Sequence, residues 1–231
     1  MQKKIHPLFK SHSFLASWII ESFPENYQDY DYIEPYCSAN ILFNKNIVHS
    51  GHIEVLNDPD SKVINIFRTL RDDSVKFISK LKKVKCCENT FQDILTKVTH
   101  DEFDELLLRQ MSRAGAKKIF KHPKHWNKLI QQLTIIAERI KDVYIFDKSP
   151  LQIIQAFDDI NTLIYINAPD ITQEEAENHA KLANYLYQSR GKVIISAYSN
   201  AFYKRHYREE DGWRFIRKKT SQGLQHLILN Y

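Results

Sequence analysis

The sequence predicts an α/β fold with a mostly parallel sheet, an antiparallel C-terminal hairpin and a helical insertion. Three observations support this prediction. Short apolar runs alternate with helical patterns, two strand-like runs close the chain, and a long charged stretch without strand signal separates the second apolar run from the third. Strands that alternate with helices are typical of parallel sheets, because each parallel connection needs a crossover. The 231 residues suit one large domain or a domain with an insertion.

The strands of the parallel part are predicted from continuous apolar runs that end at turn or polar residues. These runs lie at 32–33, 53–56, 143–146, 162–166 and 193–195. Helical patterns lie at 13–23, before the first run, at 61–70, after the second, and at 174–188, between the fourth and the fifth.

The last two strand-like runs, 213–217 and 224–229, are separated by the short turn Ser221-Gln222-Gly223. This spacing predicts an antiparallel hairpin that is either added at the edge of the sheet or inserted into it. A basic run accompanies the hairpin, but Glu209, Glu210 and Asp211 interrupt it, so a solvated edge and a phosphate-binding track are equally good interpretations.

The long stretch without strand signal predicts a helical insertion at 72–141, and residues 1–71 and 142–231 then form the α/β domain. The insertion is basic in two places. One cluster comprises Lys80, Lys82, Lys83 and Lys85. The other contains no acidic residue and comprises Arg113, Lys117, Lys118, Lys121, Lys124 and Lys128, with Trp126 among them. We expect this second cluster to contact DNA phosphates from a loop and a helix start; a solvated helix face is the alternative.

Composition excludes several classes of protein. Hydrophobic residues make up 43% and charged residues 26%, which excludes a disordered or fibrous chain. The net charge of +5 permits a nucleic-acid partner without demanding one. No run approaches the ~20 apolar residues of a membrane span, and the first residues lack the apolar core of a signal peptide. We therefore expect a cytoplasmic protein.

The cysteines and histidines do not predict a disulfide framework or a metal site. Cys37, Cys86 and Cys87 are odd in number and lack Cys-x-x-Cys spacing. His122 and His125 lie three residues apart, but neither a cysteine nor a carboxylate accompanies them in the sequence, which favours surface histidines over metal ligands.

Seven short segments resemble, in order, the motifs of one enzyme family. They are Pro7-Leu8-Phe9-Lys10, then 33–45 with Ile33-Glu34-Pro35-Tyr36, 54–58, 109–112 with the basic run to 128, 162–170, 191–198 and Gly212-Trp213. Together they resemble the Dam-like DNA adenine methyltransferases, which use S-adenosylmethionine. The resemblance implies a Rossmann-like methyltransferase sheet, S-adenosylmethionine as the cofactor, if there is any, and double-stranded DNA as the partner.

The resemblance also implies which residues contact the cofactor: Lys10, Glu34, Pro35, Ser38, Asn40, Asp58 and Ser149. Asp58 is placed to hold ribose hydroxyls, or alternatively caps the following helix. Ser149 stands where the family has an acid that contacts adenine, and Asp147 is a possible substitute. The glycine loop of the family reads Ser38-Ala39-Asn40, which places side-chain atoms where the backbone should approach the cofactor.

The catalytic segment that the resemblance implies is Asn167, Ala168, Pro169 and Asp170, where the family has Asp-Pro-Pro-Tyr. Asn167 keeps an acceptor oxygen for the adenine amine. Asp170 removes the ring that stacks on the flipped base, a contact of about 1–3 kcal/mol. The loop that covers the target base is also missing, because Thr172 and Glu175 form a capping-box pattern that begins the next helix.

These three losses predict a degenerate methyltransferase in which S-adenosylmethionine binding is weak or lost and which acts through DNA or a protein partner. Two alternatives stay open. One is an active adenine methyltransferase with divergent motifs, and the other is a structural subunit of a larger complex. Cofactor binding separates the first two hypotheses, and DNA affinity separates the third.

Overall fold

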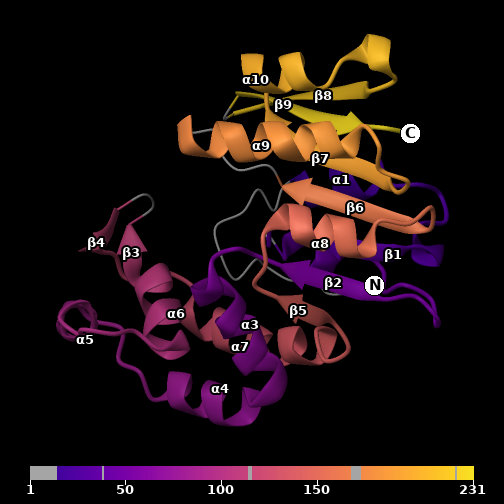
Figure 1. The fold of residues 1–231 in the computed structure, drawn as a ribbon. Coiled ribbons are helices and arrows are strands. Elements are labelled where there is room, and N and C mark those ends of the chain that lie inside the picture. The colour runs from indigo at the N-terminus through magenta and orange to yellow at the C-terminus, as the bar shows by residue number, and fades with distance from the viewer. Residues whose placement is uncertain (1–14, 38, 114–115, 168–172, 222) are drawn as a thin grey trace.

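The computed structural model describes residues 15–37, 39–113, 116–167, 173–221 and 223–231 and has an α/β architecture (Figure 1). Within these ranges seven strands form one sheet in the order β5-β2-β1-β6-β7-β9-β8. They are β1 (Asp31–Glu34), β2 (Glu54–Asn57), β5 (Tyr144–Phe146), β6 (Thr162–Asn167), β7 (Lys192–Tyr198), β8 (Arg214–Thr220) and β9 (Gly223–Leu229). Each strand overlaps a predicted apolar or strand-like run, so the α/β prediction is confirmed.

The C-terminal hairpin is added at the edge of the sheet: β8 is the edge strand, and β9 lies between β7 and β8. Neighbouring strands from β5 to β7 are parallel, whereas β9 is antiparallel to both β7 and β8. The edge strand β8 therefore runs in the same direction as β7. The sheet is mostly parallel with one reversed strand next to its edge, and the prediction of an antiparallel hairpin is confirmed.

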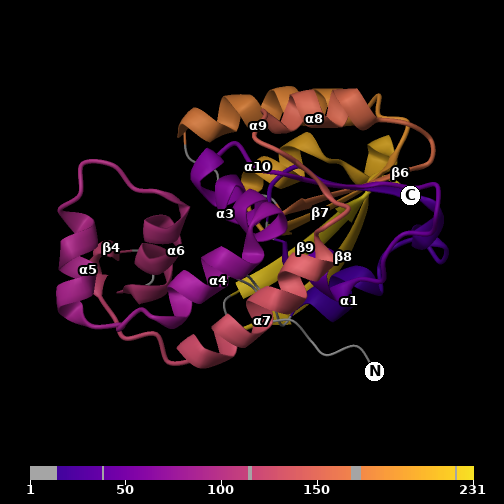
Figure 2. The ribbon, with the colours of Figure 1, turned by 90° about the horizontal axis from the view of Figure 1, so that it is seen from below.

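Alternate strand residues face two hydrophobic layers, as the pleat requires. Tyr32 and Leu56 face a cluster built with α1 (Ala16–Ile20), α2 (Asn40–Asn44) and α3 (Ser61–Asp72). Ile33 and Val55 face a second cluster, built with α8 (Pro150–Phe157), α9 (Gln173–Leu186) and α10 (Ala201–His206). Figure 2 shows α8 and α9 on one side of the sheet and α1 on the other. Short 3-10 helices span Tyr27–Asp29 and Glu209–Asp211.

The predicted insertion contains α4 (Ser74–Lys82), α5 (Glu88–Leu95), α6 (Glu102–Met111) and α7 (Trp126–Arg139). The buried side chains of α7, among them Leu133 and Ile136, belong to the same hydrophobic cluster as Tyr32 and Leu56 of the sheet. The insertion helices thus share a core with the sheet. The division at 72 and 141 stays a prediction.

The expectation of a stretch without strands is wrong at one place. β3 (Ser112–Arg113) and β4 (Ala116–Phe120) form a small antiparallel ribbon in which Ser112 pairs with Phe120 and Arg113 with Ala116. The Phe120 ring packs against Phe91 of α5, with 5.7 Å between ring centroids. This long-range contact stabilises a strand whose own pattern, rich in lysine, carries little strand signal.

No helix within the described ranges is both long and apolar enough to cross a membrane. Cys37, Cys86 and Cys87 are free thiols, each half-buried.

We predict that Gly191→Ala destabilises the protein by about 1–3 kcal/mol, because added atoms cannot be accommodated in well-packed regions without shifts. A Cβ at Gly191 would lie 2.9 Å from the Thr162 carbonyl oxygen and 3.1 Å from that of Asp159. Urea unfolding measures the change. The exposed residue Gln188 is the control, since Gln188→Ala should change the free energy of unfolding by less than about 0.5 kcal/mol. Equal stability of the two variants would contradict the steric argument.

Candidate functional site

The candidate site lies at the edge of the sheet where the parallel strands have their carboxyl ends. The buried Asn57 side chain, at the end of β2, fixes the relative positions of three strand ends. Its Nδ2 donates to the carbonyl oxygens of Pro35, at 2.8 Å, and Lys148, at 2.9 Å, and its Oδ1 accepts from the Lys148 N–H at 2.8 Å. In α/β sheets this edge is where ligands bind. Pro35 thus serves the scaffold through its carbonyl group.

Glu34, the last residue of β1, is fully buried, and its carboxylate is engaged with its own loop. Oε1 accepts from the Ala39 N–H at 2.8 Å, and Oε2 accepts from the Tyr32 hydroxyl at 3.2 Å. The carboxylate therefore stabilises the loop that the resemblance assigns to the cofactor.

Asp58, directly after β2, has both carboxylate oxygens on main-chain donors. Oδ2 accepts from the Cys37 N–H at 3.0 Å and Oδ1 from the Asp60 N–H at 2.8 Å. Burial raises the pKa of Asp58 to about 6. The alternative that Asp58 caps the next helix is wrong in detail, because Asp60 is the N-cap of α3 and accepts from the Lys62 N–H.

The loop after β1 contains a residue with left-handed backbone, Ala39. Methyltransferases of the family that the chain resembles have glycines in this loop. Among the non-glycine residues described, Ala39 alone has a positive φ, of 49°. Left-handed backbone in an L-residue costs roughly 1–2 kcal/mol. Ala39 and Asn40 are both buried, and the Asn40 oxygens accept from the Asn44 side chain. Ser38 and Lys10 lie outside the described residues.

Ser149 and Asp147 have structural partners. Ser149 is the N-cap of α8 in a capping box with Gln152: the Ser149 hydroxyl accepts from the Gln152 N–H, and the Gln152 side chain accepts from the Ser149 N–H. The Asp147 carboxylate pairs with Arg68 at 3.1 Å. Arg68 lowers the pKa of Asp147 below its usual range through this hydrogen bond.

Asn167 is the last residue of the central strand β6, as expected for the catalytic segment. Its Oδ1 accepts from the Ser196 hydroxyl at 3.3 Å, and the Ser196 hydroxyl is 2.9 Å from that of Tyr165. The predictions for Ala168, Pro169 and Asp170, and for the capping box at Thr172, lie outside the described residues.

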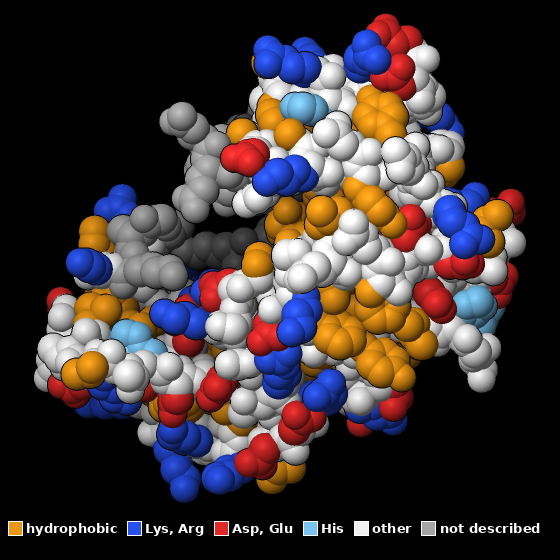
Figure 3. Space-filling model, in the orientation of Figure 1, with side chains coloured by type: hydrophobic (Ala, Val, Ile, Leu, Met, Phe, Trp, Pro, Cys, Tyr) orange, Lys and Arg blue, Asp and Glu red, His pale blue; other side chains and the backbone are white. Residues whose placement is uncertain are grey.

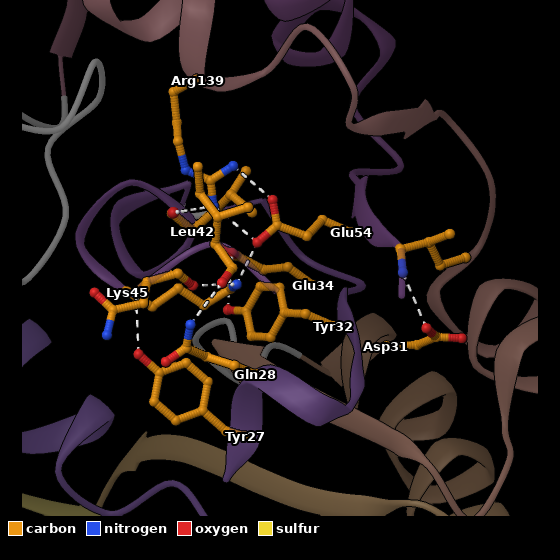
Figure 4. Close-up of polar contacts among 12 residues, drawn as sticks. Tyr27, Gln28, Asp31, Tyr32, Glu34, Leu42, Lys45, Glu54 and Arg139 are labelled. Carbon is orange, nitrogen blue, oxygen red and sulfur yellow. Dashed lines mark hydrogen bonds and ion pairs between the residues drawn. The ribbon is translucent and has the colours of Figure 1, made fainter. Parts of the chain in front are cut away.

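Figure 4 shows a buried ionic network of Lys45, Glu54 and Arg139, which the sequence did not predict. The Glu54 carboxylate on β2 pairs with Lys45, after α2, and with Arg139, at the end of α7. Arg139 Nη1 lies 2.5 Å from Glu54 Oε2, and Nη2 lies 2.8 Å from Oε1 and 2.9 Å from the Leu42 carbonyl oxygen. Lys45 also lies over the Tyr32 ring, 4.4 Å from its centroid.

Burial and the neighbouring charges have different net effects on the pKa values of Lys45 and Glu54. Burial lowers the pKa of Lys45 to about 8, against the attraction of Glu54. Burial alone would raise the pKa of Glu54, but the Arg139 hydrogen bonds and the Lys45 charge bring it below its usual range. Glu54 is thus ionised at neutral pH.

The basic cluster of the insertion lies on the β3–β4 ribbon and the segment after it, not on a loop and a helix start alone. Arg113, Lys118, Lys121 and Lys124 are exposed, and within the described residues no carboxylate forms an ion pair with them. Figure 3 shows basic side chains over this end of the molecule. Lys117 lies on β4, its side chain outside the described part, and Lys128 lies in the first turn of α7.

Arg109, in the segment that resembles the recognition region, is structural. Its guanidinium pairs with Asp60 at 2.9 Å and with Glu105 at 2.5 Å. These contacts join α6 to the N-terminus of α3 and orient the ribbon that follows α6.

No family model matches the chain, and no curated protein matches it. The resemblance to Dam-like methyltransferases stays a hypothesis. Among the described residues, no group of three or more His, Cys, Asp or Glu side chains is arranged to hold a metal ion.

We predict that the free energy of unfolding rises between pH 7 and 9.5 and that Lys45→Met removes about 1–2 kcal/mol of this rise. The pKa of Lys45 is about 8 in the folded protein, against an ordinary 10.5. Between these values the unfolded chain binds more protons, so stability increases with pH and falls as the pH returns toward 8. Urea unfolding across the pH series measures it. The exposed Lys62→Met is the control and should keep the rise; parallel profiles for wild type and Lys45→Met would contradict the assignment.

Proposed function

We propose that the chain is a DNA-binding protein with a methyltransferase-like fold in which S-adenosylmethionine binding and methyl transfer are weak or lost. The proposal for DNA rests on Lys118, Lys121 and Lys124, the exposed cations of the β3–β4 ribbon and the segment after it (the ribbon cations). The proposal for lost methyl transfer rests on the hydrogen bonds that Glu34 and Asp58 accept from the main chain.

The ribbon cations differ from many other cations of the insertion. Lys80 pairs with Asp101, and Lys97 pairs with Asp104 at 2.6 Å. In contrast, Lys118, Lys121 and Lys124 are exposed without a carboxylate partner among the described residues. Unpaired cations that project from a narrow ribbon can follow a phosphate backbone, whereas paired cations would first have to break an ion pair.

The sheet supports the family part of the proposal. The resemblance implies a Rossmann-like sheet, and the observed sheet is mostly parallel with the reversed strand β9 between β7 and β8. Asn167 ends the central strand β6 at the same edge as Glu34 and Asp58. The order of strands is thus compatible with a methyltransferase-like fold, and whether the cofactor binds depends on the side chains at the strand ends.

The residues at the edge do not fit S-adenosylmethionine. The N–H groups of Cys37 and Ala39 donate to Asp58 and Glu34, and both Asp58 oxygens accept from the main chain. The Ser149 hydroxyl is engaged as the N-cap of α8. A cofactor would have to compete with these internal hydrogen bonds, each worth about 0.5–1.5 kcal/mol net and more when charged.

We predict no calorimetric binding of S-adenosylmethionine or S-adenosylhomocysteine below a Kd of about 1 mM, which corresponds to about −4 kcal/mol. The acids that would hold the ribose and the loop already accept hydrogen bonds from the main chain, with which a cofactor would compete. Micromolar binding would contradict this prediction. Transfer of label from tritiated cofactor to mixed-sequence duplex DNA, abolished by Asn167→Ala, would support an active methyltransferase with divergent motifs instead.

We predict weak, sequence-independent and steeply salt-dependent binding to duplex DNA. Replacing Lys118, Lys121 and Lys124 together with Gln should reduce the slope of log Kd against log salt concentration by about two to three units, since each phosphate contact adds about 0.9. Fluorescence anisotropy across a salt series measures the slope.

The matched control for this experiment replaces Lys141, Lys181 and Arg190 with Gln, because each is exposed and already paired with a carboxylate. This variant has the same change in net charge and should keep most of the slope. A wild-type slope in the ribbon variant would favour the structural-subunit hypothesis.

A further inference from the structure

The C-terminal basic run, which acidic residues interrupt in the sequence, is divided by the fold into two regions. The acids Glu209, Glu210 and Asp211 lie in the connection between α10 and β8. Tyr187, directly after α9, donates to Asp211 at 3.1 Å, and the chain from Tyr187 leads to the start of β7. The acids therefore lie toward the amino end of β7, away from the candidate site.

The arginines near this amino end have partners. Arg208 pairs with Asp211 at 2.7 Å and with Glu210 at 2.8 Å. Arg214, at the start of β8, donates to the Tyr231 carbonyl oxygen at 3.0 Å. These arginines neutralise the acidic connection or stabilise the end of the chain.

The opposite region, at the carboxyl end of β7, has cations without such partners. α10 begins directly after β7, and the β8–β9 pairs Lys218–Gln225 and Lys219–Leu224 lie next to that end, because Gln225 also pairs with Tyr198. Lys204, Arg205 and Lys219 are exposed, and within the described residues none has an ion-pair partner. Lys218 is different, since it lies over the Trp18 ring at 5.3 Å.

The buried His226 lies beside the cations of this region. His226 pairs across the hairpin with Arg217, is 2% exposed, and neither ring nitrogen has a hydrogen-bond partner within the described residues. Burial lowers the pKa of His226, and the positive charges of Arg217 and Lys204 lower it further. Arg217 itself pairs with Glu209 at 3.4 Å. The lowered pKa favours the neutral imidazole, so the positive charge of this region comes from its lysine and arginine side chains.

This region and the ribbon lie toward the same edge of the sheet. Figure 1 shows β3 and β4 on the side to which β2 and β6 point, and α10 follows the end of β7 on that side. The exposed cations of the two regions therefore flank the carboxyl ends of the strands. A duplex laid across that edge would present phosphates to both.

We propose that Lys204, Arg205 and Lys219 form a second DNA-contact surface, the C-terminal basic surface, which binds phosphates of the same duplex as the ribbon. This inference rests on the proposed DNA binding and adds a second set of phosphate contacts to it. The contacts position the duplex without reading bases, because only flexible cationic side chains take part.

The experiment measures the salt slope of duplex DNA binding by fluorescence anisotropy for four proteins: the wild type, Lys204→Gln/Arg205→Gln/Lys219→Gln, the ribbon variant, and their combination. We expect each triple variant to reduce the slope by about two to three units and the combination to lose about the sum. The matched control, Arg190→Gln/Arg208→Gln/Arg214→Gln, removes the same charge from the amino-end side and should change the slope by less than about one unit. Circular dichroism verifies that each variant is folded.

The outcomes separate this inference from the proposed function. A wild-type slope in the C-terminal variant, together with a reduced slope in the ribbon variant, overturns the second surface and leaves the ribbon proposal standing. The reverse result supports the second surface and overturns the ribbon. Absence of duplex binding by the wild type overturns both. The inference is also overturned if the amino-end control loses as much of the salt slope as the C-terminal variant, or if the C-terminal variant loses slope only with duplex RNA. A wild-type slope in Lys204→Arg/Lys219→Arg, which keeps the charges, supports the inference.

Discussion

The arrangement of the candidate site depends on the ion pairs that the Glu54 carboxylate forms with Lys45 and Arg139. The carboxylate lies inside the protein with Lys45 and Arg139, so two cations from distant segments meet one acid of β2 (Figure 4). Removing one partner from such a buried group is costly, about 3–5 kcal/mol, because an uncompensated charge remains. Arg139 also donates to the Leu42 carbonyl oxygen, which attaches α7 to the helix that follows the loop after β1. The loop, the sheet and the insertion therefore have fixed relative positions.

The same network explains how the ribbon is presented. α7 begins at Trp126, directly after the basic segment, and ends at Arg139 in the network. A helix of this length spans about 21 Å and is stiff on that scale. At the other side Arg109 joins α6 to α3. The ribbon thus lies between two helices that ion pairs attach to the rest of the protein.

The inner parallel strands β1, β2, β6 and β7 could be predicted because they are short, largely apolar and buried, and such runs carry a strong local signal. The ribbon was missed because its strand β4 is lysine-rich and depends on the contact between Phe120 and Phe91. The ionic network was missed because Glu54 and Arg139 are 85 residues apart, a separation at which no spacing rule applies. The role of Ser149 was within reach, since Ser149-Pro150-Leu151-Gln152 has the capping-box pattern.

The positions of Glu34, Asp58 and Asn167 at one sheet edge followed from the order of strands, but their hydrogen-bond partners did not. A carboxylate at a strand end can hold a ligand or its own backbone, and the sequence is the same in both cases. In this molecule Glu34 and Asp58 bind main-chain N–H groups, which stabilise a loop that contains the left-handed Ala39 in place of glycine. The polar groups of the edge are thus directed inward, while the exposed cations beside it are directed outward. Among the described residues, the acids of this edge bind main-chain N–H groups, whereas Lys118, Lys121 and Lys124 have no carboxylate partner, and this contrast supports the proposed contact with a polyanion.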